Sequence, residues 1–115
     1  AGEQGHWLLG QGSNDHLIGS AGNDVFIGGA GNDLLESVGG TNTFIFSGHF
    51  GHDTVLGYQP ADSLVFLGVE GGHEADYRAH ATASGQDTVL SFGSDSVTLV
   101  GVGMASLAGA DIVIA

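Results

Sequence analysis

The sequence predicts an all-β fold: a right-handed parallel β-roll over residues 1–45, closed by an antiparallel-rich β cap over residues 46–115. Three observations predict it. An apolar residue recurs at every ninth position through the first 45 residues, glycine accounts for 22 of the 115 residues, and proline occurs once. Glycine is far above its usual share of about 7%, and it permits tight, recurrent turns between short strands. A chain of this length forms one structural module.

The roll is predicted from a nine-residue repeat that starts at residue 1. Its eighth position is always apolar: Leu8, Leu17, Phe26, Leu35 and Phe44. Its sixth position is polar: His6, Asp15, Asp24, Asp33 and Asn42. We expect positions seven to nine to form short strands and the glycine-rich segments between them to form turns. Two repeats complete one coil, so Asp15 should lie over Asp33, and Asp24 should lie between His6 and Asn42.

Stacked carboxylates in this chain need a cation. Asp and Glu number 13 against a single Lys or Arg, for a net charge of −12, so neighbouring carboxylates would repel one another. Calcium takes 6–8 oxygens at about 2.3–2.6 Å from carboxylates and from carbonyls of the kind that glycine turns expose. The expected ligands in the repeats are Asp15, Asp24, Asp33, Asn42, Gly10, Gly12, Gly19, Ala21, Gly28 and Ala30.

The predicted sites are unequal. Asp15 with Asp33 is the best pair, whereas Asn42 offers Asp24 only a neutral oxygen. His6 is a poor partner for Asp24 because imidazole is a weak ligand for a hard cation. The alternative to calcium sites is a metal-free, glycine-rich solenoid.

Residues 19–27 and 28–36 resemble the repeat GGxGxDxUx of RTX (hemolysin-type) calcium-binding proteins. The resemblance implies a calcium-loaded parallel β-roll. The first and fifth repeats depart from the pattern, as terminal repeats of a stack often do.

The second half carries a duplication of its own. Residues 51–56 (GHDTVL) are echoed by residues 85–90 (GQDTVL), and each copy continues through an aromatic residue and Asp-Ser into an apolar strand. We expect two strand–turn–strand hairpins, turning at residues 59–61 and 93–94, with another strand at 77–82 between them. Such a cap would cover the strand edges at one end of the roll.

This cap resembles the segment that follows RTX repeats in secreted bacterial enzymes. Residues 44–68 are most similar to the R-modules of mannuronan C5-epimerases, which are isomerases that modify alginate; serralysin-type proteases and RTX adhesins are the alternatives. The resemblance implies that Asp53 completes a site with Asp33. It also implies that residues 110–115, an acidic residue before an apolar run, form an uncleaved type I secretion signal; the alternative is a plain final strand.

Several function classes are excluded by composition. The chain has no cysteine, so it holds no disulfide, thiolate zinc site or cysteine nucleophile. Its only cation is Arg78, which argues against binding nucleic acid or an anionic membrane. Neither H-E-x-x-H nor G-x-S-x-G occurs, and His49-x-x-His52 is a weak zinc signal.

We therefore expect a non-catalytic, monomeric calcium-binding module of a secreted, type I exported enzyme, acting beside a parent catalytic domain. Calcium would couple folding and stability to export. The alternative is an alginate-binding module in which Arg78 contacts substrate, but a chain of net charge −12 is poorly suited to a polyanion.

Overall fold

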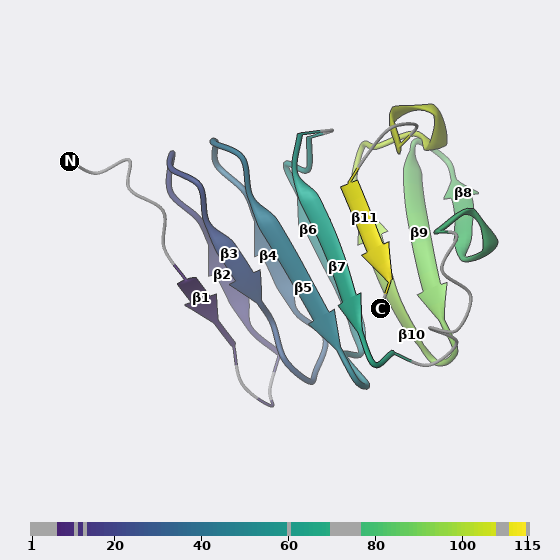
Figure 1. The fold of residues 1–115 in the computed structure, drawn as a ribbon, viewed down its shortest axis with the longest axis horizontal. Helices are drawn as coiled ribbons and strands as arrows, with labels where there is room; N and C mark the ends of the chain where they lie inside the picture. Colours follow the sequence, from purple (N-terminus) through teal and green to yellow (C-terminus); the bar gives the residue numbers. More distant parts are fainter. Residues whose placement is uncertain are drawn as a thin grey trace.

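Two sheets face each other along the length of the molecule (Figure 1). The computed structural model describes residues 7–10, 12, 14–59, 61–69, 77–107 and 111–114. Sheet A has the strand order β1-β3-β5-β7-β11, and sheet B has the order β2-β4-β6-β10-β9-β8. The strands are β1 Trp7–Leu9, β2 His16–Ile18, β3 Val25–Ile27, β4 Leu34–Glu36, β5 Thr43–Ser47, β6 His52–Leu56, β7 Ser63–Leu67, β8 Ala81–Ser84, β9 Asp87–Phe92, β10 Asp95–Leu99 and β11 Asp111–Ile114. The described residues thus confirm the predicted parallel β-roll.

The roll forms because consecutive repeats alternate between the two sheets. Each short strand places its central residue inward, and that residue stacks on the one a coil away: Leu8 on Phe26, Phe26 on Phe44, and Leu17 on Leu35. All of these pairings are parallel and join residues eighteen apart, as the repeat predicts. Glycine between the strands lets the chain reverse direction without a side chain in the way.

Parallel pairing continues beyond the nine-residue repeat. Leu35 pairs with Val55 and Phe44 pairs with Leu64, so these coils are two residues longer. The strands β5, β6 and β7 each have five residues instead of three. The rhythm of the sequence changes here, but the stacking direction does not.

An aromatic ladder fills the space between the sheets. Phe26 and Phe44 stack with ring centroids 4.8 Å apart, and Phe46 stacks on Phe66 at 5.1 Å. Phe92 from the cap continues the ladder, with its ring 4.4 Å from Phe66. All five side chains are almost fully buried, so aromatic contacts join the roll to the cap in one core.

The cap is partly antiparallel. Strands β9 and β10 form an antiparallel hairpin across Gly93 and Ser94, as predicted, and β8 adds to β9. The other predicted hairpin is wrong: β6 and β7 lie in different sheets and continue the coil. The predicted strand at 77–82 is also partly wrong, because Tyr77–Ala79 is a 3-10 helix and β8 begins at Ala81.

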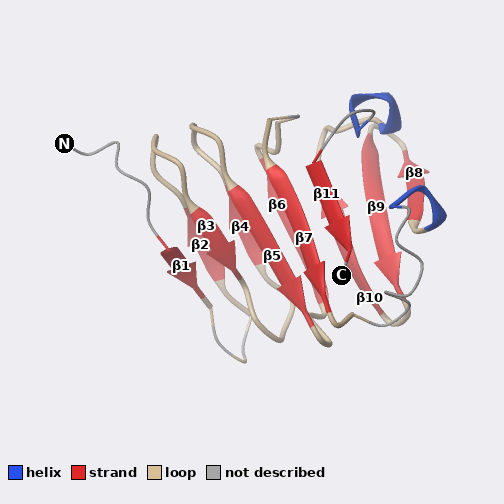
Figure 2. Ribbon diagram, viewed as in Figure 1, coloured by secondary structure: helices blue, strands red, loops and turns tan. Residues whose placement is uncertain are grey.

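Two strands of the cap, β10 and β11, extend the two sheets of the roll. Strand β10 pairs in parallel with β6, and β11 pairs in parallel with β7. The predicted final strand is therefore present at 111–114. Figure 2 shows the two 3-10 helices, Tyr77–Ala79 and Met104–Leu107, at the cap end of the roll. No helix in the described residues is long and apolar enough to cross a membrane.

Candidate metal centre

Two stacks of turns run along the roll, one leading into each sheet. The sheet-B turn stack contains Asp15, Asp33 and Asp53: Asp15 and Asp33 precede β2 and β4, and Asp53 is the second residue of β6. The sheet-A turn stack contains Asp24, Asn42 and Asp62, which precede β3, β5 and β7. Asp24, Asp33, Asn42, Asp53 and Asp62 are all buried. The predicted juxtapositions of Asp15 with Asp33 and of Asp24 with Asn42 are therefore geometrically present, whereas His6 lies outside the described residues.

One hydrogen bond recurs in both stacks. The Oδ1 atom of each side chain accepts from the backbone N–H of the polar residue one coil earlier. The four bonds are Asp15 N to Asp33 Oδ1 at 2.9 Å, Asp33 N to Asp53 Oδ1 at 2.8 Å, Asp24 N to Asn42 Oδ1 at 2.8 Å, and Asn42 N to Asp62 Oδ1 at 2.7 Å. Each turn is thereby tied to the next one in its stack. Asp53 is bonded to Asp33 in this way; that the two share a calcium site stays a prediction.

Two members of the sheet-B turn stack, Asp33 and Asp53, have an unpartnered second carboxylate oxygen. Among the described residues, the Oδ2 atoms of Asp33 and Asp53 are buried without a hydrogen bond. Burial raises the pKa of Asp53 from 3.8 to about 7, with further upward contributions from the charges of Asp33 and Asp95. Burial likewise raises the pKa of Asp33, and the charge of Asp15 adds to the effect. Such buried, unpaired oxygens are unfavourable unless a cation compensates them.

Glycines leave room for these carboxylates. A Cβ on Gly28 would lie 2.5 Å from Asp33 Oδ2, and one on Gly10 would lie 2.6 Å from Asp15 Oδ2. Each Oδ2 atom therefore lies against the backbone of its own turn, close to the chain that carries the candidate carbonyls. Among the described residues no three His, Asp or Glu side chains converge. The donor set is paired carboxylates with backbone carbonyls, which suits calcium better than a transition metal.

The other predicted ligands lie on the same turns. Gly19 lies beside Asp24, since a Cβ there would be 2.6 Å from Asp24 Oδ2. Gly12, Ala21 and Ala30 are exposed residues of the segments between strands. Arg78, the predicted substrate contact, is exposed on the 3-10 helix Tyr77–Ala79.

An outer row of asparagines was not predicted. Asn14 Oδ1 accepts from Asn32 N at 2.8 Å, Asn23 Oδ1 accepts from Thr41 N at 2.7 Å, and Asn32 Oδ1 accepts from His52 N at 2.9 Å. These side chains tie the turns together beside the carboxylates. The signal was available, because Asn precedes Asp in each of the three Asp-bearing repeats.

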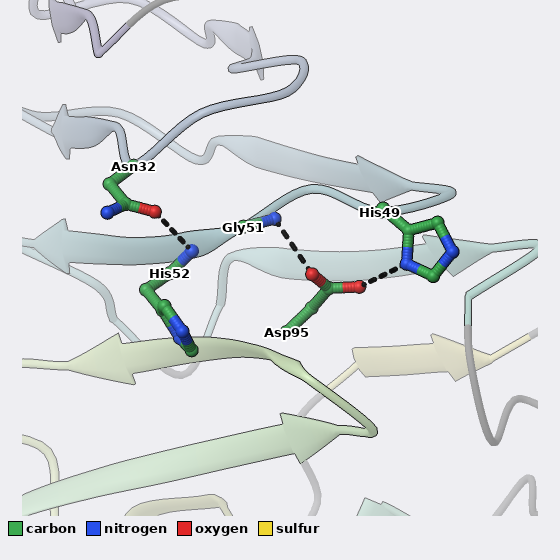
Figure 3. A network of polar contacts seen from close by, with 5 residues as sticks. All are labelled: Asn32, His49, Gly51, His52 and Asp95. Carbon is green, nitrogen blue, oxygen red and sulfur yellow. Dashed lines mark hydrogen bonds and ion pairs between the residues drawn. The ribbon is translucent and has the colours of Figure 1, made fainter.

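Sequence reasoning also missed Asp62, which belongs to the sheet-A turn stack, and Asp95, which begins β10 beside Gly51. Both precede a Ser and an apolar segment, in the same way that Asn42 and Asp53 precede Thr and an apolar segment. Figure 3 shows Asp95 between the backbone of Gly51 and the ring of His49. Asp95 Oδ1 accepts from Gly51 N at 3.2 Å, and Asp95 Oδ2 lies 3.1 Å from His49 Nδ1.

The two histidines of His49-x-x-His52 have different partners. His49 faces Asp95 (Figure 3), whereas His52 Nδ1 lies 2.8 Å from Ser96 Oγ. The motif does not bring the two rings onto a shared third ligand among the described residues.

Comparisons with known proteins agree with this geometry. Residues 7–44 match the family described as RTX calcium-binding nonapeptide repeat, in four copies. A lipase from Pseudomonas fluorescens is 63% identical over 65 residues, which cover 56% of this chain and 13% of that protein. The crystal structure of the extracellular lipase LipA from Serratia marcescens superposes with a TM-score of 0.81 at 37% identity, covering 95% of this chain and 21% of that one.

The chain therefore spans a small part of the length of each relative. The comparisons bear out the expected extracellular location, and they support neither an epimerase nor a serralysin-type parent. Residues 7–44 therefore match four copies of the RTX calcium-binding nonapeptide repeat, and calcium is the ion that such repeats bind.

Proposed function

We propose that the chain is a non-catalytic, calcium-dependent folding module of a secreted lipase that leaves the cell through a type I exporter. One observation carries the calcium part of the proposal. Asp33 and Asp53 are stacked in consecutive turns, and each has a buried carboxylate oxygen without a partner among the described residues. A cation bound there supplies the compensating charge.

The calcium ligands are best supported in the sheet-B turn stack. Carboxylates of Asp15, Asp33 and Asp53 would hold the ions together with backbone carbonyls of turns 10–15 and 28–33. These oxygens are hard ligands, and calcium accepts several of them in flexible geometry. The chain's own contribution is to hold the carboxylates one coil apart through the recurring N–H to Oδ1 bonds.

Calcium then acts through folding linkage. An ion that binds only the folded chain adds RT ln(1 + [L]/Kd), or about 2.7 kcal/mol per site at a hundred times Kd. Two such sites add about 5 kcal/mol, which is comparable to the total stability of a small domain. In low calcium the stacked carboxylates oppose folding, so the chain stays loose enough for export and folds outside the cell.

A lipase parent is supported by two comparisons. The chain is 63% identical over 65 residues to a part of the Pseudomonas lipase, and it superposes over 95% of its length on a part of the Serratia lipase. The catalysis would lie elsewhere in such a parent. Reading the encoding gene on the N-terminal side tests this: a G-x-S-x-G nucleophile elbow is expected, and the active-site motif of another enzyme class would contradict the lipase assignment.

The calcium proposal is tested by circular dichroism and tryptophan fluorescence of the 115-residue chain. We expect strand structure in millimolar calcium, its loss in excess chelator, and its recovery when calcium is restored. Magnesium at the same concentration is the control, because it prefers strict octahedral geometry and retains its waters. Equal folding in chelator and in calcium would overturn the proposal.

A further inference from the structure

We propose that calcium binds along the sheet-B turn stack, and that the side-chain amide of Asn42 closes the sheet-A turn stack to calcium. The inference rests on the proposed calcium-dependent folding and makes it specific to one edge of the roll. In both stacks the Oδ1 atom accepts the same kind of backbone hydrogen bond. The inference therefore depends on the other polar atom of the side chain, which is Oδ2 in aspartate and Nδ2 in asparagine.

In the sheet-A turn stack, the second atom is satisfied by protein donors. Asp24 Oδ2 accepts from Ser20 N at 2.8 Å, and Asp62 Oδ2 accepts from Gln59 N at 2.8 Å. Each carboxylate thus closes a small hydrogen-bonded loop within its own turn. The negative charge is held by backbone N–H groups of the preceding turn residues, and it needs no metal ion to be compensated.

Asn42 goes further, because its second atom is itself a donor. Its Nδ2 donates to Ser37 Oγ at 2.7 Å and to Gly39 O at 3.0 Å. A hydroxyl and a carbonyl oxygen are groups that calcium would use in this turn. The amide hydrogens occupy them and present partial positive charge, so a cation entering turn 37–42 would have to break both bonds and would meet repulsion.

The sheet-B turn stack is the opposite case. Asp33 Oδ2 and Asp53 Oδ2 are buried and have no hydrogen-bond partner among the described residues, and Asp33 Oδ2 lies against Gly28 of its own turn. Asp33 is 3% exposed and Asp53 is 2% exposed, so bulk water does not compensate them. The two edges therefore differ chemically. The sheet-B edge has the unpartnered carboxylate oxygens of Asp33 and Asp53, whereas the sheet-A edge has the neutral amide of Asn42, which is hydrogen-bonded within its own turn.

Asn42 affects more than one site. It accepts from Asp24 N and donates its own N–H to Asp62, so it belongs to both consecutive turn pairs of the sheet-A stack. Replacing one carboxylate by a neutral amide at this position lowers the negative charge of both pairs. A single residue thereby restricts calcium to one edge.

The experiment counts bound calcium per chain by equilibrium dialysis and isothermal titration calorimetry. We expect Asn42→Asp to gain at least one ion relative to the unchanged chain, because a carboxylate would replace the donating amide. We expect Asp33→Asn to lose at least one ion. Asp24→Asn is the matched control, since it removes the corresponding carboxylate from the other edge, and its ion count should equal that of the unchanged chain.

A second readout separates binding from folding. In chelator, with enough sucrose added to keep the calcium-free chain folded, Asn42→Asp should lower the melting temperature, because the amide bonds to Ser37 and Gly39 are lost. When calcium is added, the melting temperature of Asn42→Asp should rise by more than that of the unchanged chain. Ser37→Ala keeps every carboxylate, and it should leave the ion count unchanged even if Asp24→Asn does not fold.

The outcomes distinguish this inference from the proposed function. An unchanged count in Asn42→Asp, or the loss of an ion in Asp24→Asn or Ser37→Ala, would overturn the one-edge arrangement while leaving calcium-dependent folding intact. If the unchanged chain bound no calcium, the proposed function itself would fail.

Discussion

Replacing Asp53 by asparagine tests whether buried carboxylates create the calcium dependence. Asp53 is 2% exposed and its Oδ2 has no partner among the described residues. Burial, with the charges of Asp33 and Asp95, raises its pKa from 3.8 to about 7. One pKa unit corresponds to about 1.36 kcal/mol. The rise from 3.8 to about 7 therefore means that ionisation of Asp53 lowers the free energy of unfolding by about 4 kcal/mol.

The sign of the pH dependence follows from where the proton is held. Below pH 4 the Asp53 carboxyl is protonated in both the folded and the unfolded chain. Between pH 4 and pH 7 the unfolded chain releases the proton and the folded chain retains it. Without calcium, the free energy of unfolding should therefore fall as the pH rises through this window and level off above it.

Asp53→Asn removes the ionisation but keeps the oxygen that accepts from Asp33 N. A buried amide N–H2 without an acceptor costs about 1–3 kcal/mol, so we expect a net gain of about 1–3 kcal/mol in chelator at pH 8. In saturating calcium the same variant should lose about 3 kcal/mol, because one binding site is lost. The substitution should thus stabilise the calcium-free chain and destabilise the calcium-bound chain.

The assay is urea unfolding followed by circular dichroism at pH 5 and pH 8, in millimolar calcium and in chelator with sucrose added to keep the calcium-free chain folded. Asp62→Asn is the matched control, because Asp62 Oδ2 accepts from Gln59 N and its loss should destabilise the chain in both conditions. If the calcium-free chain became more folded from pH 5 to pH 8, or if Asp53→Asn were less stable in chelator, the burial argument would be refuted.

Three further substitutions test the packing of the roll by the same unfolding measurement in calcium. Phe44→Ala should cost about 3–5 kcal/mol, because Phe44 is fully buried and stacked on Phe26; a cost under 1 kcal/mol would contradict its place in the ladder. Gly51→Ala should cost more than Gly48→Ala: both glycines have positive φ, but only at Gly51 would a Cβ meet backbone, 2.4 Å from Gly31 O. Asn32→Ala should cost about 1 kcal/mol through the lost bond from His52 N, and no change would show that water replaces this contact.

The roll was predictable from the sequence because its structure is locally encoded. The apolar residue at the eighth position of each nine-residue repeat and the glycines between strands set one coil per two repeats, and the observed register joins residues eighteen apart. The pairing of Asp15 with Asp33 follows directly from that period. The outer asparagines occur in the same repeats, but their hydrogen bonds to the next turn depend on which side of the turn each side chain faces. The repeat pattern alone does not predict that side.

The later coils were harder to predict because a two-residue insertion breaks the period. Residues 51–56 and 85–90 look alike locally, yet β9 turns back on β10 whereas β6 continues the coil. A tight Gly93-Ser94 turn allows a hairpin, while the segment from Gly57 to Asp62 carries the chain across to the other sheet. Whether the chain forms a hairpin or another coil depends on which strands are available for pairing in each sheet. The local sequence does not contain that information.

The pairing of β11 with β7 has a consequence for the order in which the molecule can be assembled. Asp111 lies beside Ser63, 48 positions earlier, and its Oδ2 accepts from the Ser63 hydroxyl at 2.7 Å. Until residues 111–114 emerge, β7 presents an open edge of unpaired N–H and carbonyl groups, a template for pairing with another chain. If the chain left an exporter N-terminus first and folded as it emerged, the edge of β7 would stay unpaired until the last residues were outside. Delaying calcium-driven folding until the whole chain is outside would shorten that exposure.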